Sequence, residues 1–451
     1  MTTPDQPCGH APFDPQALPV DAARDIVIRQ ALRHAPRIAT EYAPLCDALD
    51  RVLAQDIVSP IDIPAHDNSA MDGYAFDGAL LATAAQATLR LPVIGKVLAG
   101  HPFTANVPHG MCVRIMTGAP MPAGCDTVIA QEFADLTDNA GDAVSAIPAI
   151  SFPVNVITRG ANCRHAGEDL AAGRIALPAG RILRTCDIGL LASLGMTSIN
   201  VKRRLRVAFF STGDELRTPG EPLDDGGIYD SNRYTLHAML RRLNVEALDF
   251  GIVRDEPAAL EATLRHAIQG ADAVITSGGV SVGDADFTRA LLQTHGNVTF
   301  WGLAMRPGRP FAFGEVWSGE QSGQNEEVPS SKDHAALFFG LPGNPVATMV
   351  AFHQLVQPAL LALVGAQPSP LPLIAALCDA PVRKRAGRTE FLRGVAMRNT
   401  QGQWHVRPCG SQGSGSLVTM SAANCFIVLA HERASVAAGE PADIILFDGL
   451  V

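Results

Sequence analysis

The chain contains 451 residues, of which 47% are hydrophobic and 18% are charged, and its formal net charge is −10. This length exceeds what one core supports and predicts roughly three or four globular domains. The acidic balance argues against nucleic-acid binding, which depends on a basic surface. No apolar run reaches the roughly twenty residues needed to cross a bilayer, so we expect no membrane association.

The N-terminus and the cysteines indicate a cytoplasmic protein. The first residues, MTTPDQPCGHAPFDPQ, lack the basic start and apolar centre of a signal peptide. The nine cysteines include no CxxC pair, and their odd number fits neither a disulfide framework nor a zinc ribbon. We therefore expect the protein to reside in the cytoplasm.

The first half of the chain alternates between helical and turn-rich segments. Apolar residues recur at helical spacing from 18 to 32, which predicts an amphipathic helix. Short Val- and Ile-containing runs separated by Gly and Pro predict a β-rich domain over 61–164. The segment 170–202 has a helical centre, CDIGLLASLGM, but is too short to bury a core. We expect it to pack with the N-terminal helix, so that 12–60 and 165–204 form one discontinuous helical linker domain with the β-rich domain inserted.

The second half begins with a clear alternation of strands and helices. RVAFFSTGDEL predicts an apolar strand that breaks at Gly213, and SNRYTLHAMLRRLN predicts a helix capped by Ser231 or Asn232. The alternation continues and predicts an α/β domain over 205–365, with a mostly parallel sheet and helices on both faces. The polar stretch 318–334 within it predicts a flexible surface hairpin loop.

Short strands and turns after the linker GAQPSPLP predict a small C-terminal β-barrel over 366–451. The expected fold class is therefore a multidomain α/β and β protein. It combines a central three-layer α/β domain, an inserted β-rich domain, a discontinuous helical linker domain and this barrel.

Acidic and glycine-rich loops follow the predicted parallel strands at their carboxyl ends, where ligands bind in such folds. The loop ITSGGVSVGDADF (275–287) lets backbone N–H groups approach a phosphate, but has Asp284 and Asp286 instead of a P-loop lysine. Carboxylates beside a phosphate indicate an intervening divalent cation, with Mg²⁺ as the expected ion. STGDEL, VRDEP and LPGNP are each compatible with a simple helix start, and Asn344 and Pro345 suit the cap and first helical positions. Together the four loops favour a nucleotide-like ligand with its metal.

Two further features add charged groups. AMRPGRPFAFG places Arg306 and Arg309 around a rigid Pro–Gly turn. Surface charge is the simple interpretation, but two guanidinium groups fixed in this way suit a tetrahedral oxyanion. DNSAMDGYA (67–75) and NCRHAGED (162–169) are turns in structural terms, and each also offers carboxylates to a neighbouring site.

Nine motifs, in this order, resemble the molybdopterin molybdotransferase family, which includes the C-terminal domain of gephyrin. They are DNSAMDGYA, RIMTGAP, GED, STGDEL, YDSNR, SGGVSVGDADF, RPGRPFAFG, LPGNPVA and QGSGS, and the match extends over residues 18–451. The resemblance implies an elongated homodimer of four-domain subunits, with an active site between the α/β domain of one subunit and the inserted β domain of the other. It implies adenylylated molybdopterin and molybdate as substrates, with Mg²⁺-dependent hydrolysis of the adenylate releasing AMP and molybdenum cofactor. The adenylyltransferase and acceptor molybdoenzymes are further expected partners.

The resemblance also assigns roles to individual positions. The family's functional polar residues match Asp67, Thr117, Asp169, Glu215, Asp255 and Asp286, of which Asp286 and Glu215 are the expected Mg²⁺ ligands. The expected substrate-binding positions are Gly213, Ser277, Gly278, Gly279, Gly283, Arg164, Pro342, Gly343 and Asn344. The expected molybdate-binding positions are Arg306, Arg309, Arg393 of EFLRG and Ser414 of QGSGS.

Two departures from the family pattern concern charge. Arg306 and Arg309 match positions that look like lysines in many relatives, so the charge is kept while the geometry of oxyanion binding changes. His165 and Ala166 stand where relatives often carry arginines, which weakens the assignment of pterin-phosphate binding to this segment.

Three alternative functions are compatible with the residues. A molybdopterin adenylyltransferase resembles 205–365 alone, and the additional domains argue against it. A gephyrin-like scaffold would lack catalysis, and the intact acidic loop residues argue against that. A tungsten-specific transferase is the third, because tungstate has nearly the shape and charge of molybdate.

Overall fold

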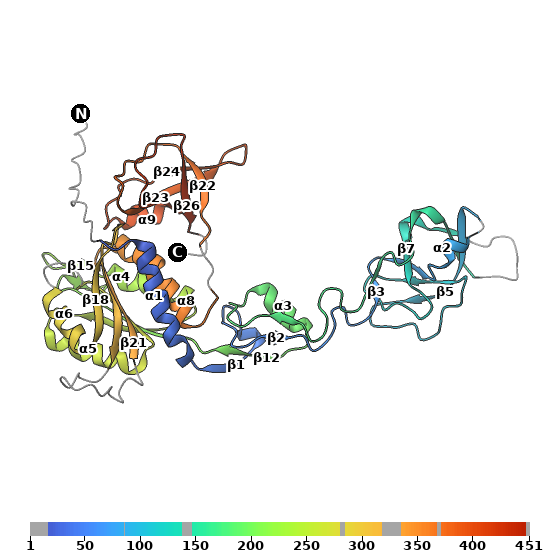
Figure 1. Cartoon of the computed structure of the whole chain (residues 1–451), viewed down its shortest axis with the longest axis horizontal. Helices are drawn as coiled ribbons and strands as arrows, with labels where there is room; N and C mark the ends of the chain where they lie inside the picture. Colours follow the sequence, from blue (N-terminus) through green and yellow to red (C-terminus); the bar gives the residue numbers. More distant parts are fainter. Residues whose placement is uncertain are drawn as a thin grey trace. The chain divides into compact units, whose positions relative to one another are not determined.

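The computed structural model describes residues 17–84, 86–137, 147–279, 285–317, 335–367 and 371–447 (Figure 1). The chain divides into two compact units. The larger unit comprises Met1–Ala54, Gly180–Ile188 and Ser198–Val451, and the smaller unit comprises Gln55–Ala179 and Gly189–Thr197. The predicted hairpin loop 318–334 lies outside the described residues, between the paired strands of a hairpin.

A six-stranded sheet forms the centre of the larger unit. Its order is β16 (Glu246–Val253), β13 (Arg206–Thr212), β17 (Ala273–Ser277), β21 (Ala335–Leu341), β20 (Pro310–Trp317) and β18 (Gly296–Gly302). The first four strands are parallel, and β20 and β18 join them as an antiparallel hairpin. This arrangement confirms the predicted α/β domain, with a mixed sheet whose four neighbouring strands run parallel.

Helices cover both faces of this sheet. They are α4 (Ser231–Arg242), α5 (Pro257–Gly270), α6 (Ala285–Thr294), α7 (Pro345–Ala351), the π-helix η6 (Phe352–Val356) and α8 (Gln357–Leu363). Successive side chains of β13 point to opposite faces: Phe209 packs in the core with α4, α7 and α8, while Phe210 packs in the core with α5 and α6. The buried, almost uninterrupted apolar sequence of β13 follows from this double coverage.

The N-terminal helix α1 (Val20–His34) belongs to the larger unit. It lies along α8, as Figure 1 shows, and its buried face joins the same core as β13. The Arg24 guanidinium donates to the backbone oxygen of Gln354 at 3.0 Å and to its side-chain Oε1 at 2.6 Å. The expectation that this helix packs with 170–202 is therefore wrong. The strands after it pair with that segment instead, β1 (Thr40–Pro44) with β12 (Ser198–Lys202) and β2 (Ile57–Val58) with β11 (Ile175–Leu177).

The segment 170–202 is less helical than predicted. It contains β11 (Ile175–Leu177), α3 (Thr185–Ser193) and β12. In β12, Ile199 and Val201 are buried and alternate with more exposed residues, which is the period of a strand. The apolar residues around α3 led to a helical prediction for the whole segment, so the strand period of β12 was not recognised.

Two details of the predicted helices also differ. The cap of α4 is Asp230, whose carboxylate accepts a hydrogen bond from the Arg233 N–H at 3.1 Å, because the helix already begins at Ser231. The continuous helical segment from Pro345 to Leu363 has 19 residues and is apolar enough to cross a membrane, so the expectation of no such run is wrong. This segment is 83% buried, which identifies it as a core helix.

The C-terminal residues form a β-barrel. Its order is β19 (Met305–Arg306), β23 (Thr389–Arg398), β24 (Trp404–Pro408), β22 (Ile374–Cys378), β26 (Pro441–Leu446) and β25 (Cys425–Leu429). An additional pairing of β23 with β25 closes the sheet, which confirms the predicted barrel. The short helix α9 (Leu417–Ala422) follows the QGSGS loop.

The smaller unit is rich in β-structure. Its sheet has the order β7 (Thr127–Ala130), β4 (Gly73–Phe76), β6 (Cys112–Ile115), β5 (Thr88–Val97), β9 (Ala149–Pro153) and β8 (Asp135–Thr137). Two short antiparallel ladders join β3 (Asn68–Ser69) to β10 (Cys163–Arg164) and β2 (Ile57–Val58) to β11. Other elements in the described residues of both units are α2 (Leu80–Thr83), β14 (Leu216–Arg217), β15 (Ile228–Tyr229), η1 (Ala35–Arg37), η2 (Leu45–Asp47), η3 (Gln131–Phe133) and η4 (Val154–Val156).

Candidate active site

The glycine turn after β17 is a point of close backbone approach. Gly278 has a φ of +98°, and a Cβ at this position would lie 2.5 Å from the backbone oxygen of Thr212 at the end of β13. Gly279 follows with a φ of +68°. Glycine is therefore required where the carboxyl ends of β13 and β17 meet. Gly283 and Asp284 lie outside the described residues, and Asp286 lies in the first turn of α6, where its side chain is not described.

A buried polar network beside this turn connects the ends of β17 and β21 with the starts of α4 and α7. The Asn232 amide donates to Ser277 Oγ at 2.8 Å and to the Gly343 backbone oxygen at 2.7 Å. The Pro342 backbone oxygen accepts from Ser277 Oγ at 3.4 Å and from Thr348 Oγ1 at 2.5 Å. The network thus gathers the predicted residues Ser277, Pro342 and Gly343 around Asn232. Within the described part of the chain, Asn232 Oδ1 has no partner and remains available as an acceptor.

A buried carboxylate lies in the same region. Asp230 is 1% exposed, and its Oδ1 accepts from Ser211 Oγ at 3.1 Å. The Arg233 guanidinium lies 3.5 Å from Asp230 Oδ2 and also pairs with Asp249. Asp230 and Asn232 were missing from the predicted site residues, although both belong to the quoted motif YDSNR. The motif YDSNR indicated these residues. Asn232 was interpreted only as a helix-capping residue, because polar residues at the start of a helix are typical of a cap.

The predicted acidic residues meet at the carboxyl ends of β13 and β16. Gly213 has a φ of +151°, and a Cβ there would lie 2.6 Å from a carboxylate oxygen of Glu215. Asp214 Oδ1 accepts from the Asp255 backbone N–H at 3.4 Å. All three carboxylates are exposed. Oxygen donors of this kind are the ligands that Mg²⁺ prefers, so the described residues fit the expected ion.

The Arg393 side chain is a buried cation with unsatisfied donors. It is 0% exposed, and its Nη2 donates to the backbone oxygens of Ser411 at 2.6 Å and Gly413 at 3.0 Å. Its Nε and Nη1 are buried and have no partner among the described residues. Burial lowers the pKa of Arg393, and the nearby Arg306 acts in the same direction. A buried guanidinium with unpaired donors is costly on its own and suits a bound anion.

Two of the other predicted molybdate-binding residues lie near Arg393, since Arg306 is beside the same barrel strand and Ser414 follows the loop residues to which Arg393 donates. Arg306 in β19 pairs with Glu390 of β23 at 3.7 Å. Ser414 accepts a hydrogen bond at its backbone oxygen from the Val346 N–H at 3.0 Å, which holds the QGSGS loop against the start of α7. Arg309 is exposed, and its backbone oxygen accepts from the Leu303 N–H at 2.7 Å. Asn344 is the N-cap residue of α7, as predicted, but its side chain makes no capping hydrogen bond.

A second polar cluster lies in the smaller unit, around the ladder of β3 and β10. Thr117 donates from its backbone N–H and from Oγ1 to Asp72 Oδ1, both at 2.7 Å. These bonds, led by the one from the backbone, lower the pKa of Asp72. Arg164 pairs with Glu168 at 2.7 Å and also with Asp169. The structure therefore surrounds Arg164 with carboxylates, and Asp72 is a member of the cluster that the predicted residues did not include.

Asp67 lies in the same cluster. Its Oδ1 accepts from the Ala166 N–H at 2.8 Å and its Oδ2 lies 3.2 Å from His165 Nδ1. The backbone bond from Ala166, followed by the His165 contact, lowers the pKa of Asp67. This carboxylate is therefore ionised and held in one orientation.

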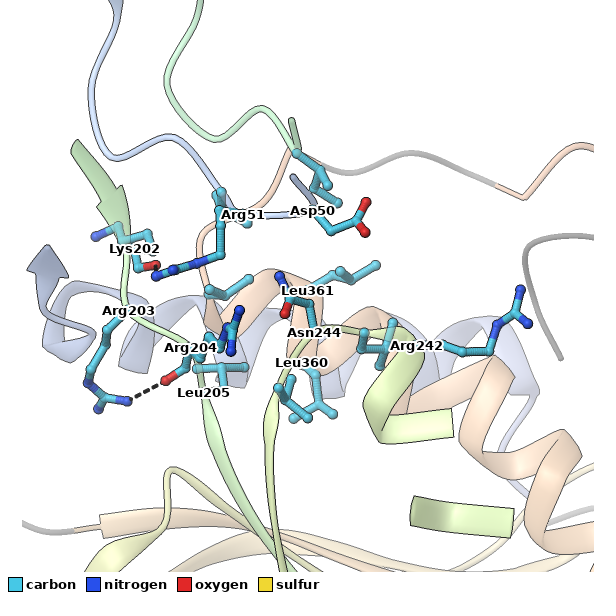
Figure 2. A pocket seen from close by; sticks show the side chains of 15 residues that line it. Asp50, Arg51, Lys202, Arg203, Arg204, Leu205, Arg242, Asn244, Leu360 and Leu361 are labelled. Carbon is cyan, nitrogen blue, oxygen red and sulfur yellow. Dashed lines mark hydrogen bonds between the residues drawn. The ribbon is translucent and has the colours of Figure 1, made fainter. Parts of the chain in front are cut away.

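A cleft of about 100 Å³ lies elsewhere in the larger unit, at the amino ends of β13 and β16 (Figure 2). Leu205 and Val245, which precede these strands, line it together with several basic residues. Two of the arginines are already paired, Arg51 with Glu41 and Arg203 with Asp272. None of the predicted site residues lines this cleft, so the candidate site is at the opposite, carboxyl end of the sheet.

Three family models match the sequence. Residues 18–195 match the MoeA N-terminal region (domain I and II), residues 208–362 match a probable molybdopterin binding domain, and residues 375–447 match the MoeA C-terminal region (domain IV). The matches together include all the motifs that the candidate site uses.

Individual relatives match over nearly their whole length. The chain is 42% identical over 413 residues to a molybdopterin molybdenumtransferase of Haemophilus influenzae, covering 91% of this chain and 95% of that protein. It is 34% identical over 405 residues to one of Nostoc sp., covering 89% and 87%. A crystal structure of the molybdopterin biosynthesis moeA protein from Pyrococcus horikoshii aligns with a TM-score of 0.73 at 28% identity, covering 95% of this chain and 100% of that one.

Proposed function

Because the chain belongs to the MoeA family of molybdopterin molybdenumtransferases, we propose that it inserts molybdenum into molybdopterin during molybdenum cofactor biosynthesis. In detail, we propose that the substrates are adenylylated molybdopterin and molybdate, and that hydrolysis of the adenylate releases AMP. We also retain the domain boundaries 61–164, 205–365 and 366–451 and a cytoplasmic location as parts of this proposal. Of the discontinuous domain 12–60 with 165–204 we retain the part that excludes α1, because α1 packs in the core of the α/β domain.

The observation that supports molybdate binding is the unsatisfied Arg393 side chain. Its Nε and Nη1 are buried donors without a partner in the described residues. A tetrahedral oxyanion would accept both hydrogen bonds and neutralise the buried charge. Arg306, whose charge acts on Arg393, and then Arg309 and Ser414 would complete the binding site.

The turn after β17 would bind the phosphate end of the adenylylated substrate. Gly278 and Gly279 carry no side chain, so this part of the turn would offer its backbone N–H groups to the phosphate. The unpartnered Oδ1 of Asn232 would accept a hydrogen bond from an N–H or O–H group of the substrate beside the phosphate. Gly213, Ser277, Gly279, Gly283, Pro342, Gly343 and Asn344 are the other residues that we assign to substrate binding.

Glu215 and Asp286 are the residues that would hold Mg²⁺, with Asp255 nearby. Bound there, Mg²⁺ would neutralise charge on the phosphate oxygens. Glu215 and Asp214 would orient the ion and the attacking water by their charge and by hydrogen bonds, while the glycine turn would fix the phosphate. Positioning of this kind accounts for much of the catalysis of phosphoryl chemistry.

We propose that the working unit is a homodimer. In it, Asp67, Thr117, Arg164 and Asp169 of one subunit would add to the substrate site of its partner. The adenylyltransferase that supplies the substrate, and the molybdoenzymes that accept the product, would be transient partners.

One assay tests the proposal. Purified protein is incubated with adenylylated molybdopterin, Mg²⁺ and molybdate, and we expect AMP release together with cofactor that activates an apo-molybdoenzyme. Tungstate in place of molybdate measures oxyanion preference. ATP consumption with molybdopterin alone would instead indicate an adenylyltransferase, and absence of any pterin-dependent activity would indicate a scaffold.

A further inference from the structure

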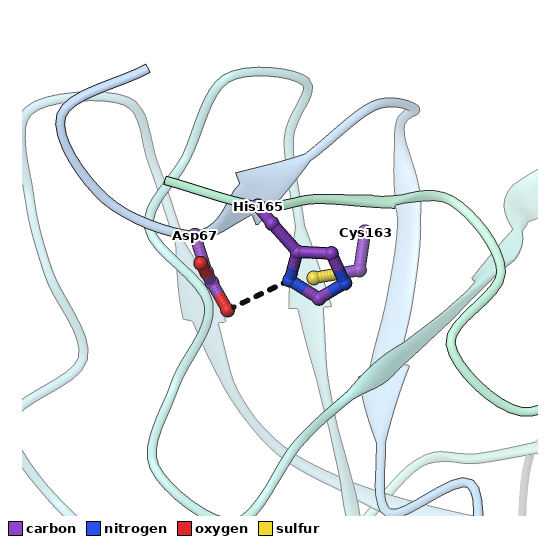
Figure 3. Close-up of side chains that lie close together, drawn as sticks. All are labelled: Asp67, Cys163 and His165. Atoms are coloured by element: carbon purple, nitrogen blue, oxygen red, sulfur yellow. Dashed lines mark hydrogen bonds and ion pairs between the residues drawn. The ribbon is translucent and has the colours of Figure 1, made fainter. Parts of the chain in front are cut away.

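Three side chains of different chemistry meet in the smaller unit (Figure 3). Asp67, Cys163 and His165 each offer one ligand atom, and these atoms all lie within 4.8 Å of one another. The proposed transferase reaction assigns no role to Cys163 or His165. Carboxylate, thiolate and imidazole are the three side-chain groups that bind zinc in proteins.

The backbone places these residues together. Strands β10 and β3 pair antiparallel, with Cys163 opposite Ser69 and Arg164 opposite Asn68. Continuing this register by one residue puts His165 opposite Asp67. Because side chains alternate along a strand, Cys163 and His165 share one face while Arg164 points to the other. The positive charge of Arg164 is further engaged by Glu168 and Asp169.

The carboxylate is anchored on one oxygen and leaves the other facing the cluster. Asp67 Oδ1 accepts from the Ala166 N–H at 2.8 Å, and Oδ2 lies 3.2 Å from His165 Nδ1. The backbone hydrogen bond to Oδ1 fixes the orientation of the carboxylate, as hydrogen bonds from outside the ligand set do in known metal sites. Figure 3 shows the Oδ2 atom directed at the imidazole ring, with the Cys163 sulfur beside it.

The surroundings of the thiol are negatively charged. The carboxylates of Asp67, Asp126 and Glu168 act electrostatically on Cys163. A cation bound between the three groups would reverse the local field and stabilise the thiolate.

We propose that Asp67, Cys163 and His165 form a binding site for a divalent cation of the zinc class. The mixed sulfur, nitrogen and oxygen donors select a borderline metal and disfavour Mg²⁺ and Ca²⁺, which prefer oxygen alone. Tetrahedral bonds of about 2.0–2.3 Å require ligand atoms about 3.3–3.8 Å apart. The exposed fractions of His165 (68%) and Asp67 (49%) allow these side chains to close that distance without repacking a core.

Three protein ligands leave a fourth tetrahedral position for water or a substrate atom. The site is separate from the Mg²⁺ ligands proposed for the transferase reaction. It also stands without that reaction, because metal binding is measured in the absence of pterin and molybdate.

Cobalt is the spectroscopic probe for the test, because Co²⁺ takes tetrahedral sites with the same ligands. Full-length protein freed of metal with EDTA is titrated with Co²⁺. We expect one equivalent per chain with a thiolate-to-cobalt charge-transfer band, displaced by Zn²⁺ and not by excess Mg²⁺. Cys163→Ser should abolish the band, and His165→Gln should lower the affinity by at least about tenfold. Cys186→Ser, which changes an exposed cysteine of the larger unit, should leave the band unchanged.

A second measurement uses the unaltered chain, in case the variants do not fold. Bound Zn²⁺ should slow alkylation of Cys163 by iodoacetamide at least about tenfold, as measured by peptide mass spectrometry. Alkylation of the exposed Cys186 should stay unchanged. The proposal is overturned by a missing charge-transfer band, by a band that persists in folded Cys163→Ser protein, or by equal zinc protection of both cysteines.

Discussion

The two polar clusters differ in how completely their groups are paired. Around Arg393 the cation is fully buried, and two of its donors are unpaired within the described residues. Around Arg164 the cation is partly exposed and already pairs with Glu168 and Asp169. A buried, unpaired donor loses hydration without compensation, whereas an exposed ion pair contributes little to stability. The comparison teaches that Arg393 keeps buried donors that a ligand can accept, while the Arg164 guanidinium is already paired with its own neighbours.

Arg393→Met should have the largest effect, measured as loss of the stabilisation that molybdate gives. Unchanged stabilisation in this variant would contradict the contrast drawn between Arg393 and Arg164. Molybdate at 100 times its Kd should raise the unfolding free energy of the wild-type protein by about 2.7 kcal/mol. The variant should lose this stabilisation, because methionine fills the space without donating hydrogen bonds. Urea unfolding with and without molybdate measures the difference.

The matched control is Arg398→Met on the same strand, where the guanidinium lies 4.8 Å from the centre of the Trp404 ring. Molybdate should stabilise this variant against unfolding as much as it stabilises the wild-type protein. Equal loss in both variants would show that molybdate acts through general positive charge.

Gly278→Ala should destabilise the folded state by about 1–3 kcal/mol. The added Cβ would lie 2.5 Å from the Thr212 backbone oxygen at a φ of +98°. Gly402→Ala is the control, since its φ is +80° and a Cβ there meets nothing within 4 Å. Equal unfolding free energies for the two variants would contradict the close contact at the strand ends.

Glu215→Gln should lower Mg²⁺-dependent AMP release by at least about tenfold, because the amide keeps the shape and loses the charge that holds the ion. Raising the Mg²⁺ concentration should recover part of the rate. Glu246→Gln, at the amino end of β16, should not change the Mg²⁺ dependence. A Glu215→Gln enzyme with unchanged Mg²⁺ dependence would remove Glu215 from the metal site.

Asp67→Asn should have the smallest effect. It should lower the free energy of unfolding by less than about 1 kcal/mol, because the carboxylate is half exposed. The Ala166 N–H, followed by His165, lowers its pKa from the ordinary value of 3.8. Its stabilising contribution is therefore present above pH 3.8 and disappears as the pH falls through the lower, folded-state pKa. Urea unfolding should separate wild type from variant at pH 6 and not in strong acid. A difference that persists in strong acid would exclude the carboxylate charge as its source.

The sequence alone was sufficient for the fold class, and it identified candidate site residues where they stand in short contiguous motifs, although their roles stay predictions. Gly278 and Arg393 are examples, because the glycine turn and the EFLRG and QGSGS motifs are contiguous in the chain. Asn232 was missed because its partners Ser277 and Gly343 lie 45 and 111 residues further along the chain. The placement of α1 failed for the same reason, since its partner Gln354 is 330 residues away. Asp72 was missed because one motif contains two aspartates, and only the fold distinguishes the one that Thr117 contacts.

The packing of α1 on α8 has a consequence for synthesis. The N-terminal helix must wait until more than three hundred further residues have been made before its buried face finds a partner. The smaller unit, by contrast, is almost one continuous stretch ending at Ala179, with a short return at Gly189–Thr197. We therefore expect the smaller unit to become protease-resistant on ribosome-stalled chains while α1 is still unpaired, because domains fold as they emerge. Although α1 is made early, it is then among the last of the described helices to be buried.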